Sequence, residues 1–298
     1  MKALATFIMK GRTQAVMAAS VFMVLALLIT PLGIFSAAVI GLVTLRHGLR
    51  EGLLGMAALG FLLFGQPLAL ATTGALLWLP LMALAEVLRV TRSLRLVVEI
   101  SVILGLLMIA SQYLFMDDVA GFWKGLLSEY SAQIMDPSVI TEAERNTMVE
   151  KIAPWMAGGL AAAWFLQLTL ALFLARSWQA VLYHPGGFAQ EFRELRLGYW
   201  LLILVPVLLL SGMLSEKPGF LAQGALVGMA AFFLQGVAVV HGLVARLKAG
   251  SGWLIGFYLL LVIGMPASFT LVSAAGFADG LVNFRARVRA RDPKQGDG

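Results

Sequence analysis

The stretch that decides the fold is the polar interval at residues 116–154, MDDVAGFWKGLLSEYSAQIMDPSVITEAERNTMVEKIAP. It contains seven acidic and three basic residues, a formal charge of −4, whereas the whole chain carries +6. Long apolar runs precede and follow it, and basic residues stand in most of the other connections. An acidic interval between two hydrophobic blocks is typical of a multi-pass membrane protein whose basic loops face the cytoplasm.

The composition supports a membrane protein. Of the 298 residues, 60% are hydrophobic and 13% are charged, whereas soluble domains average roughly 45–50% and 25%. One core of a water-soluble domain cannot bury this many apolar residues. The composition therefore indicates that lipid surrounds much of the chain. The basic residues flank apolar runs, which indicates anionic lipid headgroups rather than nucleic acid as their partners. Because the chain has no cysteine, disulfides, thiolate metal sites and cysteine nucleophiles are excluded.

The apolar runs predict an all-α polytopic transmembrane helix bundle of about 8–10 segments. Residues 15–45 would form a helix of about 46 Å, too long for a ~30 Å hydrocarbon core, so a bend at Pro31 is expected. Residues 253–284 are expected to bend at Pro266, as a hairpin or re-entrant pair. The other expected spans are residues 53–65, 68–88, 96–115, 155–175, 197–214 and 220–245, and the fourth of these either ends at 175 or continues as helix to 183.

Charge and hydropathy together predict four regions. The first transmembrane block covers residues 1–115, and the acidic extracytoplasmic loop covers residues 116–154. The second transmembrane block covers residues 155–284, and a basic cytoplasmic tail covers residues 285–298. Counting basic loops places both termini in the cytoplasm. The expected location is a bacterial cytoplasmic (inner) membrane.

The acidic loop is expected to contain two helices. Apolar residues recur at helical spacing over residues 119–135, which predicts an amphipathic helix. Thr141 and Glu144 have the spacing of a capping box, which predicts a second short helix ending before Pro154. This pair either lies on the membrane surface or forms a lid over a binding cavity. In the second case, Trp123 and Tyr130 are the ligand candidates.

The sequence contains none of the motifs expected of common enzymes. It has no P-loop, HExxH or GxSxG motif, and its three histidines are scattered. We therefore expect no metal site, no cofactor and no enzymatic activity. The buried-charge candidate is Asp279, within the last apolar run between Gly276 and Gly280. It either pairs with a basic residue as a structural anchor or contacts a ligand.

The segment 183–196 is the most distinctive connection. Pro185, Gly186 and Gly187 predict a sharp turn after a long helix. Charges of alternating sign then follow, and they form either a solvated face or a docking site for a protein partner. These partner-contact candidates are Glu191, Arg193, Glu194 and Arg196.

Two stretches carry a family resemblance. The segment LYHPGGF at residues 182–188 with EFR at 191–193, and GFADG at 276–280 with NFR at 283–285, resemble the YybS-like family of uncharacterised bacterial multi-pass membrane proteins. The first half is similar in pattern to S components of energy-coupling-factor transporters, and this likeness extends to MreD-type rod-shape proteins. The resemblance implies an S-component-like core, with an AxxxA pair on the first helix, here Ala15 and Ala19, contacting a transmembrane coupling subunit.

Two functions follow as hypotheses. The first is a small-molecule substrate-binding or transport component that lacks its own motor and works with a coupling subunit. The alternative is a structural or scaffolding protein of the cell envelope, which binds an envelope protein through residues 191–196 and the basic tail. Both place the chain in the lipid bilayer.

Overall fold

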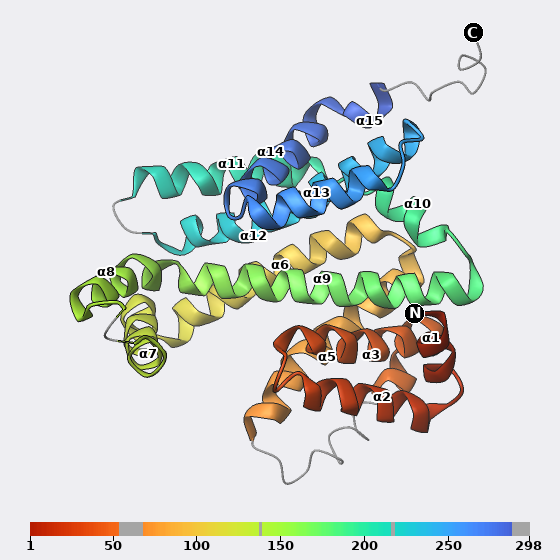
Figure 1. The fold of residues 1–298 in the computed structure, drawn as a ribbon, viewed down its shortest axis with the longest axis horizontal. Coiled ribbons are helices and arrows are strands. Elements are labelled where there is room, and N and C mark those ends of the chain that lie inside the picture. Colours follow the sequence, from red (N-terminus) through yellow and green to blue (C-terminus); the bar gives the residue numbers. More distant parts are fainter. Residues whose placement is uncertain (54–67, 137–138, 216–217, 288–298) are drawn as a thin grey trace. The chain divides into compact units, whose positions relative to one another are not determined.

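The structure is a computed structural model that describes residues 1–53, 68–136, 139–215 and 218–287, with only the backbone for residues 68–73 (Figure 1). Every regular element in these ranges is a helix, so the prediction of an all-α chain is confirmed. The expected span at residues 53–65 and most of the basic tail lie outside the described residues.

Five of the described helices are long and apolar enough to cross a membrane. Four shorter apolar helices, of 10–17 residues, accompany them. The chain therefore has the helices of an integral membrane protein. The five long helices are Thr30–His47, Gly74–Thr91, Leu94–Phe115, Glu142–Tyr183 and Phe220–Arg246.

Contacts divide the chain into two compact units. Unit 1 comprises Met1–Ser101 and Leu166–Leu195, and unit 2 comprises Val102–Phe165 and Arg196–Gly298. Helices α6 (Leu94–Phe115) and α9 (Met156–Tyr183) each contribute residues to both units. The units are described separately below.

Unit 1 is built on a helical hairpin. The chain breaks near Pro31, as predicted: the 3₁₀ turn η1 (Thr30–Leu32) separates α2 (Arg12–Leu25) from α3 (Gly33–His47). The Ser36 hydroxyl on α3 donates a hydrogen bond to the Ala19 carbonyl on α2 at 2.8 Å, and α3 also packs against α5 (Leu68–Thr91). The unit also contains α1 (Lys2–Ile8) and α10 (Gly187–Arg193).

Unit 2 is organised around α12 (Phe220–Arg246), which packs against α11 (Tyr199–Leu214) and α14 (Ala267–Val282). The last apolar run is divided at Pro266 into α13 (Gly252–Ile263) and α14, which confirms the predicted bend. The acidic loop forms α7 (Val119–Ile134) and α8 (Glu142–Ile152), also as predicted. The unit is completed by η2 (Ala153–Trp155) and α15 (Phe284–Arg287).

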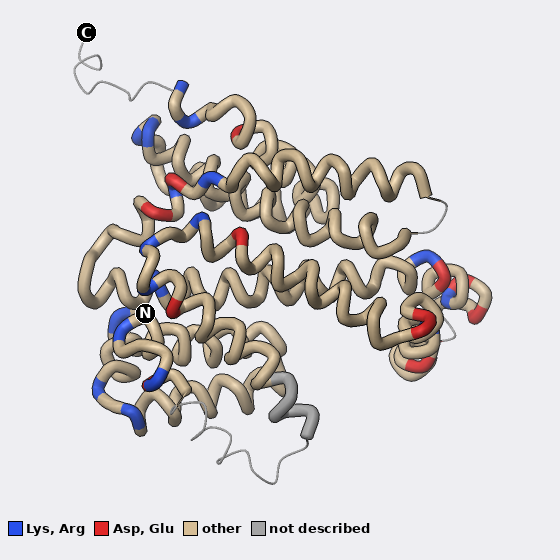
Figure 2. Tube along the Cα trace, turned by 180° about the vertical axis from the view of Figure 1, so that it is seen from behind, with Lys and Arg blue, Asp and Glu red and all other residues tan. Residues whose placement is uncertain are grey.

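Each unit has one basic end. In unit 1, the Arg46 guanidinium lies 4.4 Å from the centre of the Tyr183 ring, so the ends of α3 and α9 are neighbours. In unit 2, Arg246 donates a hydrogen bond to the Arg285 carbonyl, which brings the end of α12 to α15. Figure 2 shows that, within unit 2, the acidic residues of α7 and α8 lie at the other end from this basic group. Such clustering is what cytoplasmic basic loops require; the orientation itself stays a prediction.

Candidate functional site

A polar pocket lies at the basic end of unit 1. Its volume is about 270 Å³. Residues from the ends of three long helices and from α10 form its wall, and we call it the arginine pocket. Its lining residues are Leu45, Leu88, Arg89, Arg92, Arg176, Gln179 and Glu191.

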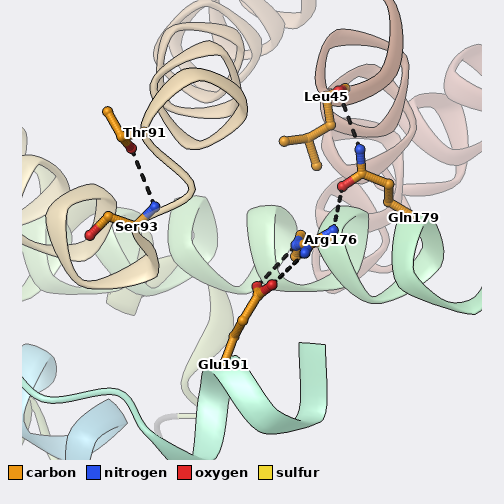
Figure 3. A network of polar contacts seen from close by, with 6 residues as sticks. All are labelled: Leu45, Thr91, Ser93, Arg176, Gln179 and Glu191. Atoms are coloured by element: carbon orange, nitrogen blue, oxygen red, sulfur yellow. Dashed lines mark hydrogen bonds and ion pairs between the residues drawn. The ribbon is translucent and has the colours of Figure 1, made fainter. Parts of the chain in front are cut away.

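A tight turn between α5 and α6 places Arg92 at the pocket. Its φ of 53° lies in the left-handed region, which a non-glycine residue adopts only where the surroundings fix it. The Ser93 N–H donates to the Thr91 hydroxyl at 3.3 Å (Figure 3), and the Leu96 N–H donates to the Ser93 hydroxyl at 3.2 Å. The first hydrogen bond spans Arg92 and fixes the turn, and the second makes Ser93 the N-cap of α6.

Arg176 and Glu191 form another part of the wall. The Arg176 Nε donates to a Glu191 carboxylate oxygen at 3.0 Å, and Nη2 donates to the other oxygen (Figure 3). Their side chains are 19% and 32% exposed, so the pair is partly desolvated. Such a two-pronged contact fixes the plane of the guanidinium as well as its position.

Gln179 connects this pair to α3. Arg176 Nη1 donates to Gln179 Oε1 at 2.7 Å, and Gln179 Nε2 donates to the Leu45 carbonyl at 3.2 Å (Figure 3). Because Leu45 is in the last turn of α3, where carbonyls lack helical partners, the amide satisfies one of them. A continuous hydrogen-bonded path thus runs from α10 through α9 to the end of α3.

The turn at residues 184–187 brings Glu191 to Arg176. Gly186 has a φ of 87°, which favours glycine, and it reverses the chain after α9. The rings of Phe188 and Phe192 then pack on Phe173 of α9, with centroids 5.8 and 5.6 Å from it. This apolar cluster folds the short α10 back along α9.

The pocket has a surplus of positive charge. Three arginines line it, against one carboxylate that Arg176 already occupies. Arg89 is paired with Glu86 at 2.9 Å. Arg92 is exposed and has no ion-pair partner among the residues that the structure describes. The arrangement can therefore bind an anion.

The two ligand candidates of the acidic loop have different surroundings. The Trp123 indole N–H donates to Gln112 Oε1 at 3.0 Å, which attaches α7 to the end of α6. Tyr130 is 56% exposed. Lys124 on α7 forms an ion pair with Glu150 on α8 at 2.9 Å, so the two helices are held to each other. In this arrangement Trp123 contributes to the attachment of α7.

Ala15 and Ala19 are covered by the chain itself. They are 6% and 0% exposed, and the Ala19 carbonyl accepts the hydrogen bond from Ser36. Ala15 lines a second pocket of about 710 Å³ in unit 1, beside the Arg12–Glu51 ion pair. In this structure, the AxxxA pair therefore takes part in the packing of α2. Its contact with a coupling subunit stays a prediction.

The four charged residues after the turn have separate roles. Glu191 belongs to the arginine pocket, and Arg196 donates to the Gly280 carbonyl at 2.8 Å within unit 2. Arg193 and Glu194 are exposed at the end of α10. The alternating charges thus do not form one continuous face.

Asp279 is fully buried, and it forms an ion pair with Arg285 at 2.7 Å. The partner comes from the next turn of the chain rather than from a distant segment. Gln235 on α12 donates to the Gly276 carbonyl at 2.8 Å and accepts a hydrogen bond from the Leu197 N–H at 2.8 Å. The Gln235 contacts tie α12 and α14 to each other and to the segment before α11. The ion pair with Arg285 indicates an anchoring role for Asp279.

The arginines of the pocket were not among the residues singled out from the sequence. Arg89 and Arg92 belong to a loop whose basic residues are explained by topology alone, and Arg176 is an isolated charge near the end of an apolar run. The sequence offers one signal for this site: a charged residue at the end of an apolar helical run, such as Arg176, needs a polar partner. The chain matches no family model, no curated protein and no solved structure.

Proposed function

We propose that this integral membrane protein binds a small anionic molecule in the arginine pocket, as the substrate-binding component of a transport system. The observation that carries the proposal is Arg92, which has no ion-pair partner among the described residues. It lines a pocket whose other charged residues are already held by ion pairs. Arginines at membrane interfaces commonly extend toward headgroups. Here the turn at Arg92 and the Arg176–Glu191 pair instead support arginines that line one pocket.

The lack of a motor supports a component rather than a complete transporter. The sequence contains no P-loop, so any ATP-driven cycle requires another subunit. An S-component-like core and a relation to the YybS-like family are part of this proposal. A lid role for Trp123 is not part of it, because its indole is engaged with Gln112.

The scaffold alternative has less support from the geometry. It uses the charged residues 191–196 and the basic tail as docking surfaces. Glu191 and Arg196 form hydrogen bonds within the chain, which leaves Arg193 and Glu194 as the exposed charges of this stretch.

Native mass spectrometry of the protein, gently extracted from its own membrane, tests the proposal. We expect a stoichiometric small-molecule adduct on the wild type and on Arg95→Gln, and loss of that adduct in Arg92→Gln. Arg95 is the matched control, because it follows the same turn, is 54% exposed and pairs with Glu99 outside the pocket. An equal adduct in both variants, or no adduct in the wild type, would refute the proposal.

A further inference from the structure

We infer that the ligand of the arginine pocket carries a phosphate group. This inference rests on the proposed function, since it names the chemistry of the molecule bound at that same site. It follows from the hydrogen-bonding groups that the pocket leaves unused, from their charge and from the size of the space.

The pocket offers many donors and few acceptors. A guanidinium has five N–H donors and no acceptor. Arg176 uses three of its donors on Glu191 and Gln179, and Arg89 uses one on Glu86. No hydrogen bond or ion pair is described for the Arg92 side chain. A ligand that satisfies this set must present several acceptor oxygens and negative charge.

The acceptors of the wall are already occupied. Both carboxylate oxygens of Glu191 accept from Arg176, and the Gln179 carbonyl oxygen accepts from the same guanidinium. A ligand rich in donors, such as an amine or a sugar without a charged group, would find few partners there. The pocket therefore selects against neutral and cationic molecules.

The three arginines come from two segments that are far apart in the sequence. Arg89 and Arg92 belong to the end of α5 and its turn, whereas Arg176 belongs to α9. A carboxylate has two oxygens and is satisfied by one guanidinium in a two-pronged contact. A phosphate has additional oxygens, arranged tetrahedrally, so it can accept from guanidiniums that approach from separate directions. The arrangement therefore fits phosphate better than carboxylate.

The volume limits what is attached to the phosphate. The pocket of about 270 Å³ corresponds to roughly nine water molecules at ~30 Å³ each. It admits a phosphate with a small organic group. An acyl chain would have to remain outside, so the two sources of this chemistry are a free phosphorylated metabolite or inorganic phosphate, and the headgroup of a phospholipid.

Two measurements on the full chain distinguish these sources. In the first, inorganic phosphate is titrated onto delipidated protein in detergent, with acetate at the same ionic strength as the comparison. In the second, the protein is placed in nanodiscs of phosphatidylglycerol and phosphatidylcholine, and retained phospholipid is counted by native mass spectrometry. Each is done with the wild type, Arg92→Gln and Arg95→Gln.

Saturable phosphate binding that weakens about tenfold or more in Arg92→Gln, but not in Arg95→Gln, would support a free phosphoanion, since a hydrogen bond to a charged group contributes at least that factor. Retained phospholipid lost only in Arg92→Gln would support a headgroup. The inference is overturned if neither ligand depends on Arg92, or if acetate binds as tightly as phosphate. An Arg92-dependent adduct from the native membrane that contains no phosphorus would also overturn it, yet leave the proposed function intact.

Discussion

Replacing Gly276 with alanine should separate the two helices at the centre of unit 2. A Cβ built at Gly276 would lie 2.0 Å from the Phe232 carbonyl oxygen and 2.6 Å from the Gly236 backbone nitrogen of α12. Both are backbone atoms of a regular helix, so no side-chain rotation can relieve the overlap. To restore an ordinary contact, α12 and α14 must move apart by more than about 1 Å.

The cost can be worked from three contributions. Overpacking a close contact typically costs 1–3 kcal/mol, and a backbone obstacle places this one at about 3. Separation also weakens the 2.8 Å hydrogen bond from Gln235 to the Gly276 carbonyl, which contributes about 1 kcal/mol. The higher helix propensity of alanine stabilises the folded state by about 1 kcal/mol. The free energy of unfolding should therefore fall by about 3 kcal/mol.

The matched control is Gly256→Ala on α13, where a new Cβ meets no atom within 4 Å. It should leave stability unchanged or raise it by up to about 1 kcal/mol. The free energy of unfolding is measured by equilibrium titration with a denaturing detergent, followed by tryptophan fluorescence. If Gly276→Ala is no less stable than Gly256→Ala, then the close approach of α12 and α14 is not as described.

Three further substitutions or conditions test other parts of the molecule. Asp279→Asn should cost about 3 kcal/mol, because it leaves the Arg285 guanidinium, 6% exposed, without its carboxylate; a double variant with Arg285→Gln should cost less than the sum of the two single changes. Thr141→Ala should destabilise the start of α8 by about 1 kcal/mol, because it removes the hydroxyl that accepts from the Glu144 N–H at 3.3 Å, and hydrogen exchange of that amide should accelerate. The hydrogen bond from Arg12 lowers the pKa of Glu51 below its ordinary 4.5, so the contact should persist down to that pH and be lost only as the pH falls through the lowered value; NMR titration of the Glu51 carboxyl carbon checks this, and a pKa at or above 4.5 would contradict it.

The features predicted correctly from the sequence are those encoded locally. Pro31 and Pro266 each interrupt an apolar run too long for a bilayer, and the chain breaks at both. The amphipathic helix predicted at residues 119–135 is present as Val119–Ile134. The capping box of Thr141 and Glu144 is formed in full. In each case, a few neighbouring residues suffice to fix the backbone.

The sequence contains pairs of glycines four residues apart, such as Gly224 and Gly228, Gly252 and Gly256, and Gly276 and Gly280. This spacing lets helices approach closely, but it does not show which pairs are used. Gly276 touches the backbone of α12, and Gly228 lies against Val205, where a Cβ would meet a side-chain carbon at 2.4 Å. Gly252 and Gly256 have the same spacing, yet nothing lies within 4 Å of either added Cβ. The motif states that a helix can be approached closely; whether a neighbour is there depends on the fold.

The arginine pocket was beyond the sequence for the same reason. Arg92 and Arg176 are 84 residues apart in the printed sequence, and a positive-inside pattern explains each of them separately. Two local features join them. The left-handed turn directs Arg92, and the Phe173 cluster folds α10 back so that Glu191 fixes Arg176. Arginine thus serves both as a marker of cytoplasmic loops and as a residue of a binding site. Only the structure, in which several arginines line one pocket, distinguishes the two roles. The decisive comparison is therefore Arg92 with Arg95, which carry equal charge and are three residues apart, but only Arg92 lines the pocket.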